Sequence, residues 1–191
     1  STPSFELELQ EELPLDVKDS EDEISIASGS LTLVITKKNW SMTYYRNGEM
    51  ITRSAGRDLA LMKTDFRGFA YNETDAEETY MRQMLSLSVG ELVYGTGERF
   101  TPFVKNGQSI DIWNADGGTS TEQSYKNIPF FITNKGYGVL VNHPEKVSIE
   151  VATEMVTRTE FSVEGGYLDS FLINGPSMKE VLTRYTDLTG K

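Results

Sequence analysis

The stretch from Ser30 to Ile51, SLTLVITKKNWSMTYYRNGEMI, is the clearest indication of the fold. Its apolar residues recur at every second position, first at Leu31, Leu33 and Ile35 and then at Trp40, Met42 and Tyr44. This period of two is typical of half-buried strands. The Asn47-Gly48 pair that follows supplies the positive φ values of a tight hairpin turn, and Met50 begins a return strand. The stretch therefore predicts antiparallel strands joined by short turns.

Alternating apolar residues predict further strands along the chain. They fall at Phe5–Gln10, Leu85–Val89, Ile110–Ile112, Ile128–Asn142 with a turn at 134–136, and Phe161–Ile173 as a hairpin around Glu164–Gly166. From Arg53 to Tyr80 the alternation is weak, so we expect a long irregular connection or an edge there.

A single helix is expected at the end of the sequence. Ser177 to Glu180 forms a capping box, and Gly190 is placed to end the helix. One helix face carries the apolar residues Met178, Val181, Leu182, Tyr185 and Leu188. We predict an all-β fold: a two-sheet antiparallel β-sandwich with a short C-terminal helix, and residues 1–191 as one domain.

The composition argues against several classes of function. The net charge of −11 argues against nucleic-acid binding, which needs a basic face, and much of this charge lies in residues 1–23. The chain has no cysteine, which excludes disulfides and thiolate metal sites and suits a reducing compartment, so we expect a cytoplasmic protein. It also lacks an apolar run of about 18 residues, so no membrane partner is expected.

The segment from Tyr94 to Pro129 carries the candidate binding site. Trp113, Asn114 and Asp116 precede the glycine-punctuated run 117–121, which places an aromatic face, an amide and a carboxylate at the mouth of a loop. This mixture suits a polyhydroxylated sugar ring. Two structural alternatives stay open. Asp116 could cap a turn, and Trp113 could be a core aromatic, although the alternation places Trp113 on the other face of the strand from Ile110 and Ile112.

Other motifs point to structural roles. The lone His143 is expected to be a structural loop residue, and no spacing indicates a metal or a cofactor. Gly95-Thr96-Gly97 lacks the rest of a phosphate loop and is interpreted as a tight strand exit, with Glu98 and Arg99 pairing at or beneath the loop. Glycoside hydrolysis needs two carboxylates about 5 to 10 Å apart, and no convincing pair is present. The sequence thus indicates a binding or positioning element without catalytic residues.

The motifs of this segment closely resemble the amino-terminal domain of glycoside hydrolase family 31. They are YGTGERF at 94–100, WNADGGTSTEQ at 113–123, YKNIPF at 125–130, GYGVLVNHP at 136–144 and YTDLTG at 185–190. Together they cover roughly residues 30 to 191. The GGTSTEQ and YKNIPF strings look most like the α-xylosidase branch.

The resemblance implies a galactose-mutarotase-like β-sandwich that packs against a (β/α)8 barrel lying outside residues 1–191. Both catalytic aspartates of the family lie on that barrel, so this domain inherits no catalytic residue. The resemblance also implies that Asp116, with Gly117, Gly118 and Thr119 beside it, contacts substrate hydroxyls near the leaving-group sugar.

Three interpretations follow. In the leading one, the chain is the non-catalytic N-terminal domain of a retaining α-glycosidase, an α-xylosidase or α-glucosidase, with an oligosaccharide substrate. In the second, it is an autonomous carbohydrate-binding β-sandwich that uses Trp113 or Trp40 as a platform. In the third, it supports the barrel or forms contacts between copies of a homo-oligomer.

Overall fold

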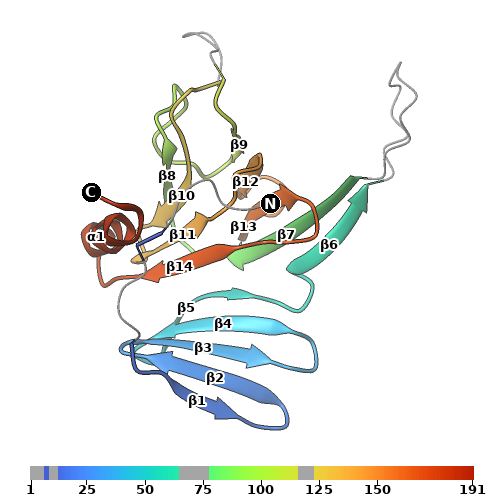
Figure 1. Cartoon of the computed structure of the whole chain (residues 1–191), viewed down its shortest axis with the longest axis vertical. Helices are drawn as coiled ribbons and strands as arrows, with labels where there is room; N and C mark the ends of the chain where they lie inside the picture. The colour runs from blue at the N-terminus through green and yellow to red at the C-terminus, as the bar shows by residue number, and fades with distance from the viewer. Residues whose placement is uncertain (1–6, 9–12, 65–77, 116–122) are drawn as a thin grey trace.

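The computed structural model describes residues 7–8, 13–64, 78–115 and 123–191. Within these ranges the chain is mostly antiparallel β-structure with one helix near its C-terminus, which confirms the all-β prediction. The strands are divided among three sheets, which we number in the order in which the chain enters them (Figure 1).

The first sheet is a five-stranded meander that forms the lower layer in Figure 1. Its strands are β1 (Asp16–Asp19), β2 (Glu23–Ser28), β3 (Leu31–Thr36), β4 (Ser41–Arg46) and β5 (Glu49–Ser54). Asn47 and Gly48 both have positive φ, 50° and 84°, which confirms the predicted hairpin turn between β4 and β5.

The second and third sheets form the two facing layers of a sandwich. The second sheet has the order β6 (Leu59–Thr64), β7 (Glu78–Ser86), β13 (Arg158–Glu164), β12 (Val147–Val151) and β9 (Gln108–Ile112). The third has the order β14 (Ser170–Asn174), β11 (Tyr137–Val141), β10 (Asn127–Thr133) and β8 (Val93–Gly97). The chain crosses between these two sheets several times, including once between β9 and β10.

A common core fills the space between the second and third sheets. Its largest fully buried side chains include Tyr137 and Phe131 from the third sheet and Phe161 from the second. The rings of Phe131 and Phe161 are 6.3 Å apart in a tilted arrangement that aromatic pairs favour. Removal of these apolar surfaces from water is the main force that holds the two layers together.

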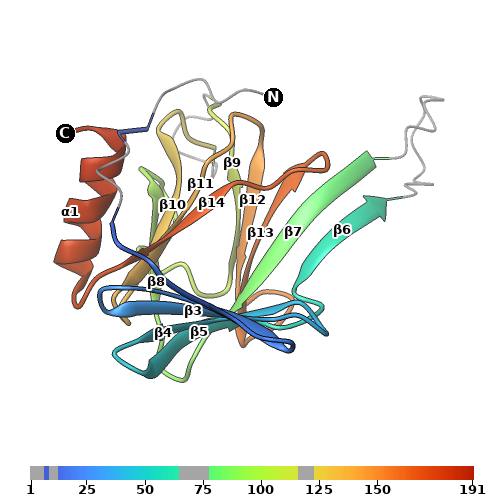
Figure 2. The same cartoon turned by 60° about the horizontal axis from the view of Figure 1, so that its bottom comes forward.

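Helix α1 (Met178–Thr189) covers the outer face of the third sheet (Figure 2). Its Val181 is fully buried, and the ring of Tyr185 stacks on Phe130 at 4.0 Å. The side chain of Ser177 accepts a hydrogen bond from the backbone N–H of Glu180, which confirms the predicted N-cap. No helix in the described part of the chain is both long and apolar enough to span a membrane.

The first sheet is fixed to the sandwich through β4 and β5. The hydroxyl of Thr52 donates to the carbonyl of Ser86 at 2.9 Å, and the guanidinium of Arg46 donates to the carbonyls of Gly136 and Gly175 at 2.8 and 2.6 Å. Ile51 adds its side chain to the core that the other two sheets share.

Three local predictions need correction or comment. The region from Arg53 to Tyr80 was expected to be a long irregular connection or an edge, and its described part contains β6, an edge strand of the second sheet, and the start of β7, which pairs with it. The hairpin expected around Glu164–Gly166 is wrong, because β13 pairs with β12 and β7 whereas β14 pairs with β11 in the other sheet. Most of the strand expected at Phe5–Gln10 lies outside the described residues, and Leu7 and Glu8 belong to no strand.

Candidate functional site

The predicted substrate-binding residues Asp116, Gly117, Gly118 and Thr119 lie outside the described residues. The structure does describe both ends of the connection that carries them. We call residues 113–115, which follow β9, the outgoing foot, and residues 123–126, which lead into β10, the returning foot. Both feet lie at the end of the sandwich that is uppermost in Figure 1.

Trp113 in the outgoing foot is an exposed aromatic residue. Ile110 and Ile112 on β9 point into the core, and Trp113 is 58% exposed, so the interpretation of Trp113 as a core residue is wrong. Trp113 lines a hollow of about 290 Å³. The other residues of its lining are Asn114, Asn127, His143 and Glu145, which are polar, and Ile112, Pro129 and Pro144, which are apolar. An exposed indole beside amide and carboxylate groups is suited to contact with a sugar ring.

Asn127, the first residue of β10, joins the two feet. Its side-chain N–H groups lie within hydrogen-bond distance of the Trp113 carbonyl (2.9 Å), the Asn114 side-chain oxygen (3.1 Å) and the Ser124 carbonyl (2.6 Å). Its backbone N–H also donates to the Asn114 side chain at 3.1 Å. The Ser124 carbonyl accepts a second hydrogen bond, from the backbone N–H of Ala115 at 2.9 Å.

Arg99 ties the exit of β8 to the same cluster. One of its terminal nitrogens donates to the carbonyl of Asp111 and to the side-chain oxygen of Asn127, while its Nε donates to the carbonyl of Thr96 at 3.3 Å. The guanidinium stays charged at any ordinary pH and presents its donors in a rigid fork. Arg99 thus fixes three strand ends from two sheets with respect to one another.

The side chain of Glu98 pairs with Lys126 across the foot at 2.7 Å. Both groups are largely exposed, and the hydrogen bond to Glu98 raises the pKa of Lys126. Glu98 was expected to pair with Arg99. In the structure Glu98 pairs with Lys126, and Arg99 donates to backbone carbonyl oxygens and to the side-chain oxygen of Asn127.

Gly95, Thr96 and Gly97 all have positive φ, which confirms the tight strand exit. A Cβ on Gly97 would lie 2.0 Å from the carbonyl oxygen of Lys126. The backbones of β8 and the returning foot approach so closely that only glycine fits at this position.

His143 borders the cavity beside Trp113 but has structural partners on both ring nitrogens. Its Nε2 accepts the backbone N–H of Asp169 at 2.8 Å, which leaves the proton on Nδ1, 3.0 Å from the carboxylate of Glu145. The ring is buried, and Tyr167 lies against it at 5.4 Å. This arrangement supports the structural role expected for His143.

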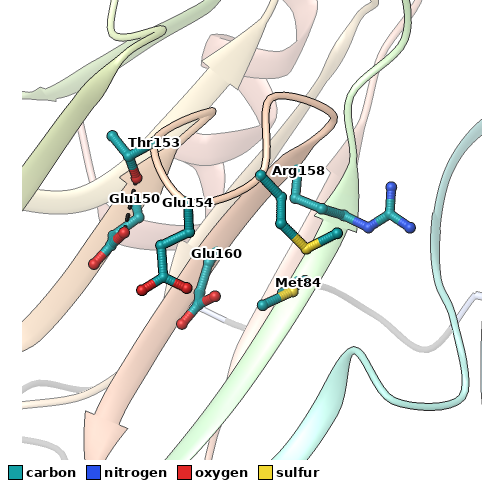
Figure 3. A pocket seen from close by; sticks show the side chains of 7 residues that line it. Met84, Glu150, Thr153, Glu154, Arg158 and Glu160 are labelled. Carbon is teal, nitrogen blue, oxygen red and sulfur yellow. Dashed lines mark hydrogen bonds between the residues drawn. The ribbon is translucent and has the colours of Figure 1, made fainter.

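Two other hollows are less suited to a sugar. One, at the turn between β12 and β13, has a volume of about 10 Å³, room for about one water molecule. Figure 3 shows its carboxylates, Glu150, Glu154 and Glu160, grouped together while the guanidinium of Arg158 points away. Burial raises the pKa of Glu160. The charge of Arg82 works against this increase, and the carboxylates of Glu154 and Glu150 add to it.

The other hollow is larger, about 770 Å³, and lies between the β2–β3 turn, β14 and α1. Its lining is mainly apolar, with Leu31, Phe171 and Leu188 among the contributing side chains. In the described part of the chain, no group of three or more histidine, cysteine or carboxylate side chains is arranged to hold a metal ion.

The sequence points to Trp113 and Asn114 in this site but gives no separate signal for Asn127 or Arg99. Both residues belong to sequence motifs that carry the family resemblance. For Asn127, the local indication of a backbone-binding role is an asparagine next to a strand of apolar residues. Their role depends on strand ends that meet only in the folded chain.

Comparison with known proteins gives consistent results. The family described as the glycosyl hydrolase 31 N-terminal galactose mutarotase-like domain matches residues 1–150. The α-xylosidase XylQ of Lactiplantibacillus pentosus is 43% identical over 190 residues, which is 98% of this chain and 24% of that protein. The α-xylosidase of Emericella nidulans is 62% identical over 112 residues, which is 59% of this chain and 14% of that protein. The chain thus spans a quarter or less of the length of these curated relatives.

Solved structures share the fold. A GH31 dextranase of Flavobacterium johnsoniae, complexed with isomaltotriose, superposes with a TM-score of 0.77 at 20% identity, covering 93% of this chain and 21% of that one. A xylosidase from Aspergillus niger gives a TM-score of 0.69 at 21% identity, covering 89% of this chain and 24% of that one.

Proposed function

Because this chain belongs to the family of glycosyl hydrolase 31 N-terminal galactose mutarotase-like domains, we propose that it is the non-catalytic amino-terminal domain of a larger retaining α-glycosidase. The substrate is an oligosaccharide from which α-linked xylose or glucose is released. The 43% identity to an α-xylosidase over almost the whole chain is the observation that carries this proposal, and it favours xylose.

In this proposal the chemistry takes place on a (β/α)8 barrel of the same polypeptide. Two carboxylates there act as nucleophile and as acid/base in a double displacement. The domain described here contributes the connection between β9 and β10, with Asp116 as an acceptor for adjacent hydroxyls of the leaving-group sugar and Gly117, Gly118 and Thr119 beside it. We also place the enzyme in the cytoplasm, because a chain without cysteine suits a reducing compartment.

The geometry of the feet supports this role for the connection. The feet are held together by polar contacts, of which the one to the Ser124 carbonyl is half-buried and the one to the Trp113 carbonyl is exposed. Trp113, which is exposed, and Asn114 both line the hollow next to these contacts. Fixed ends lower the ordering cost of a connection that binds a sugar.

The test is the Asp116→Ala substitution in the complete enzyme. We expect kcat/KM for a disaccharide to fall while hydrolysis of an aryl α-glycoside, whose leaving group is not a sugar, is nearly retained. An unchanged kcat/KM for the disaccharide would show that Asp116 is not part of the leaving-group subsite.

The exposure of Trp113 favours a second candidate function, an autonomous carbohydrate-binding module. Such a module binds sugar without any barrel, whereas the leading proposal expects no measurable binding by residues 1–191 alone. Calorimetric titration of the isolated chain with xylo- and gluco-oligosaccharides separates the two, because only the module gives a saturable heat signal that Trp113→Ala removes.

A further inference from the structure

The sequence contains three Asn-Gly pairs, at 47–48, 106–107 and 174–175. Asparagine is among the thermolabile residues of proteins, and it loses its side-chain amide most easily before glycine, because no side chain hinders the backbone nitrogen of glycine. The reaction requires that this nitrogen and the side-chain amide of the asparagine are both free to meet. The three pairs differ widely in this respect.

The pair Asn174-Gly175 is buried at the end of β14. The backbone N–H of Gly175 donates to the carbonyl of Gly136 at 3.0 Å. The side chain of Asn174 donates to the hydroxyl of Ser30 at 3.1 Å. Both groups that would have to react are therefore held, so reaction at this pair requires local opening of the structure.

The pair Asn106-Gly107 is held in the same way just before β9. The side-chain oxygen of Asn106 accepts from the N–H of Val93 at 2.9 Å, and its amide nitrogen donates to the carbonyl of Glu91 at 3.0 Å. The N–H of Gly107 donates to the carbonyl of Val151 at 2.6 Å. Reaction here also requires that these hydrogen bonds break first.

The pair Asn47-Gly48, in the turn between β4 and β5, is free of such restraints. Both residues are exposed. Within the part of the chain that the structure describes, neither the side chain of Asn47 nor the backbone N–H of Gly48 has a hydrogen-bond partner. No atom lies within 4 Å of the Cβ position of Gly48, so the turn has room to change its torsion angles.

We propose that Asn47-Gly48 is a site of spontaneous modification and that the product loosens the first sheet from the sandwich. The Gly48 nitrogen attacks Cγ of Asn47 and a cyclic imide forms. The side-chain nitrogen leaves as ammonia and takes the proton of the Gly48 N–H. Water then opens the imide at either of its carbonyls, which gives aspartate or isoaspartate.

Isoaspartate at this position disturbs the attachment of the first sheet. Its main chain is longer by a methylene group, within a turn that has to place Arg46 opposite Glu49. Arg46 donates to the carbonyls of Gly136 and Gly175 in the sandwich, at 2.8 and 2.6 Å. A displaced turn therefore acts on contacts that join the two parts of the protein.

The experiment compares the three pairs in the complete enzyme under mildly alkaline conditions, folded and unfolded in urea. Peptide mapping by mass spectrometry measures conversion of Asn47, Asn106 and Asn174. In the folded protein Asn47 should react more than about tenfold faster than the other two, because their local opening costs at least about 1.4 kcal/mol. In urea the three rates should be similar. Equal rates in the folded protein, or the same preference for Asn47 in urea, would overturn the proposal.

Asn47→Gly is the matched control for the structural consequence. It retains a Gly-Gly pair that suits the tight turn but has no side-chain amide. Once most of Asn47 has reacted in wild type, hydrogen exchange of the β4 and β5 amides should be several-fold faster than in fresh protein. Asn47→Gly incubated in the same way should show no change. Unaltered exchange in the reacted wild type, or an equal increase in Asn47→Gly, would show that the modification does not loosen the sheet and would overturn the proposal.

Discussion

The phenol of Tyr137 donates a 2.6 Å hydrogen bond to Oε1 of Glu91 in the interior of the protein, where Tyr137 is fully buried and Glu91 is 3% exposed. The other carboxylate oxygen of Glu91 accepts from the backbone N–H and the hydroxyl of Ser88, at 2.8 and 2.9 Å. The carboxylate is thus fully partnered, and it fixes the turn that leads from β7 into β8. The same turn sets where β8 begins, and β8 leads to Gly97 and Arg99.

Tyr137→Phe should destabilise the protein without creating a cavity. The substitution removes only the hydroxyl, so Oε1 of Glu91 is left buried without its donor, which costs about 1 to 3 kcal/mol or more for a charged group. Urea unfolding of the 191-residue chain measures the change. Tyr125→Phe, at a side chain that is 67% exposed, is the control and should stay within about 0.5 kcal/mol of wild type.

The same tyrosine predicts a loss of stability at alkaline pH. Burial and the neighbouring Glu91 raise the pKa of Tyr137 well above its ordinary value. The unfolded chain releases this proton near pH 10, so the stabilisation is complete below about pH 10 and is lost as the pH rises toward the folded-state pKa.

Urea unfolding between about pH 8 and about pH 11 tests this expectation. The free energy of unfolding should fall more steeply for wild type than for Tyr137→Phe. Burial also raises the pKa values of Tyr44 and Tyr185, but these residues are present in both proteins, so the difference isolates Tyr137. Identical slopes would show that Tyr137 titrates normally.

Local chemistry made the turns and the helix predictable from sequence. The Asn47-Gly48 turn and the Ser177 cap depend on residues within a few positions of one another, and both are present as predicted. For the region of β6 the sequence left an irregular connection or an edge open, because at the sheet edge Leu61 is 55% exposed and no clean alternation develops. The predicted β13–β14 hairpin was wrong because the choice of partner strand is not local. Strand β14 pairs with β11, so that Tyr137 lies opposite Asn174, although β12 and β13 come between these two strands in the sequence.

The candidate site was predictable only in part, for the same reason. The outward direction of Trp113 follows from its position one residue beyond Ile112, so the alternation of the strand is enough to predict it. The role of Asn127 depends on the meeting of β8, β9 and β10, whose ends come from two different sheets. No spacing in the sequence encodes that meeting.

Gly97→Ala should be strongly destabilising. A Cβ at Gly97 would lie 2.0 Å from a backbone oxygen, and the φ of 90° is unfavourable for alanine. Gly107→Ala is the matched control, because Gly107 has a φ of 83° with nothing within 4 Å of its Cβ position.

Backbone strain alone should cost about 1 to 2 kcal/mol at either glycine. Gly97→Ala should therefore lower the free energy of unfolding by clearly more than Gly107→Ala, as measured by urea denaturation. Equal losses would mean that β8 and the returning foot can separate without cost, which would also weaken the case for a rigid base to the connection.

Trp113→Ala in the complete enzyme tests whether the outgoing foot itself contacts the sugar. The substitution keeps the Trp113 carbonyl that Asn127 binds but removes an indole that is 58% exposed and lines the cavity. Because an aromatic contact contributes about 0.5 to 1.5 kcal/mol, we expect kcat/KM for the disaccharide to fall up to about tenfold. Trp40→Ala is the control: Trp40 is 52% exposed in the turn between β3 and β4, on the first sheet and far from both feet, and its loss should leave turnover unchanged. If the two substitutions have equal effects, the exposure of Trp113 is incidental, and Asp116 would act without an aromatic neighbour from this domain.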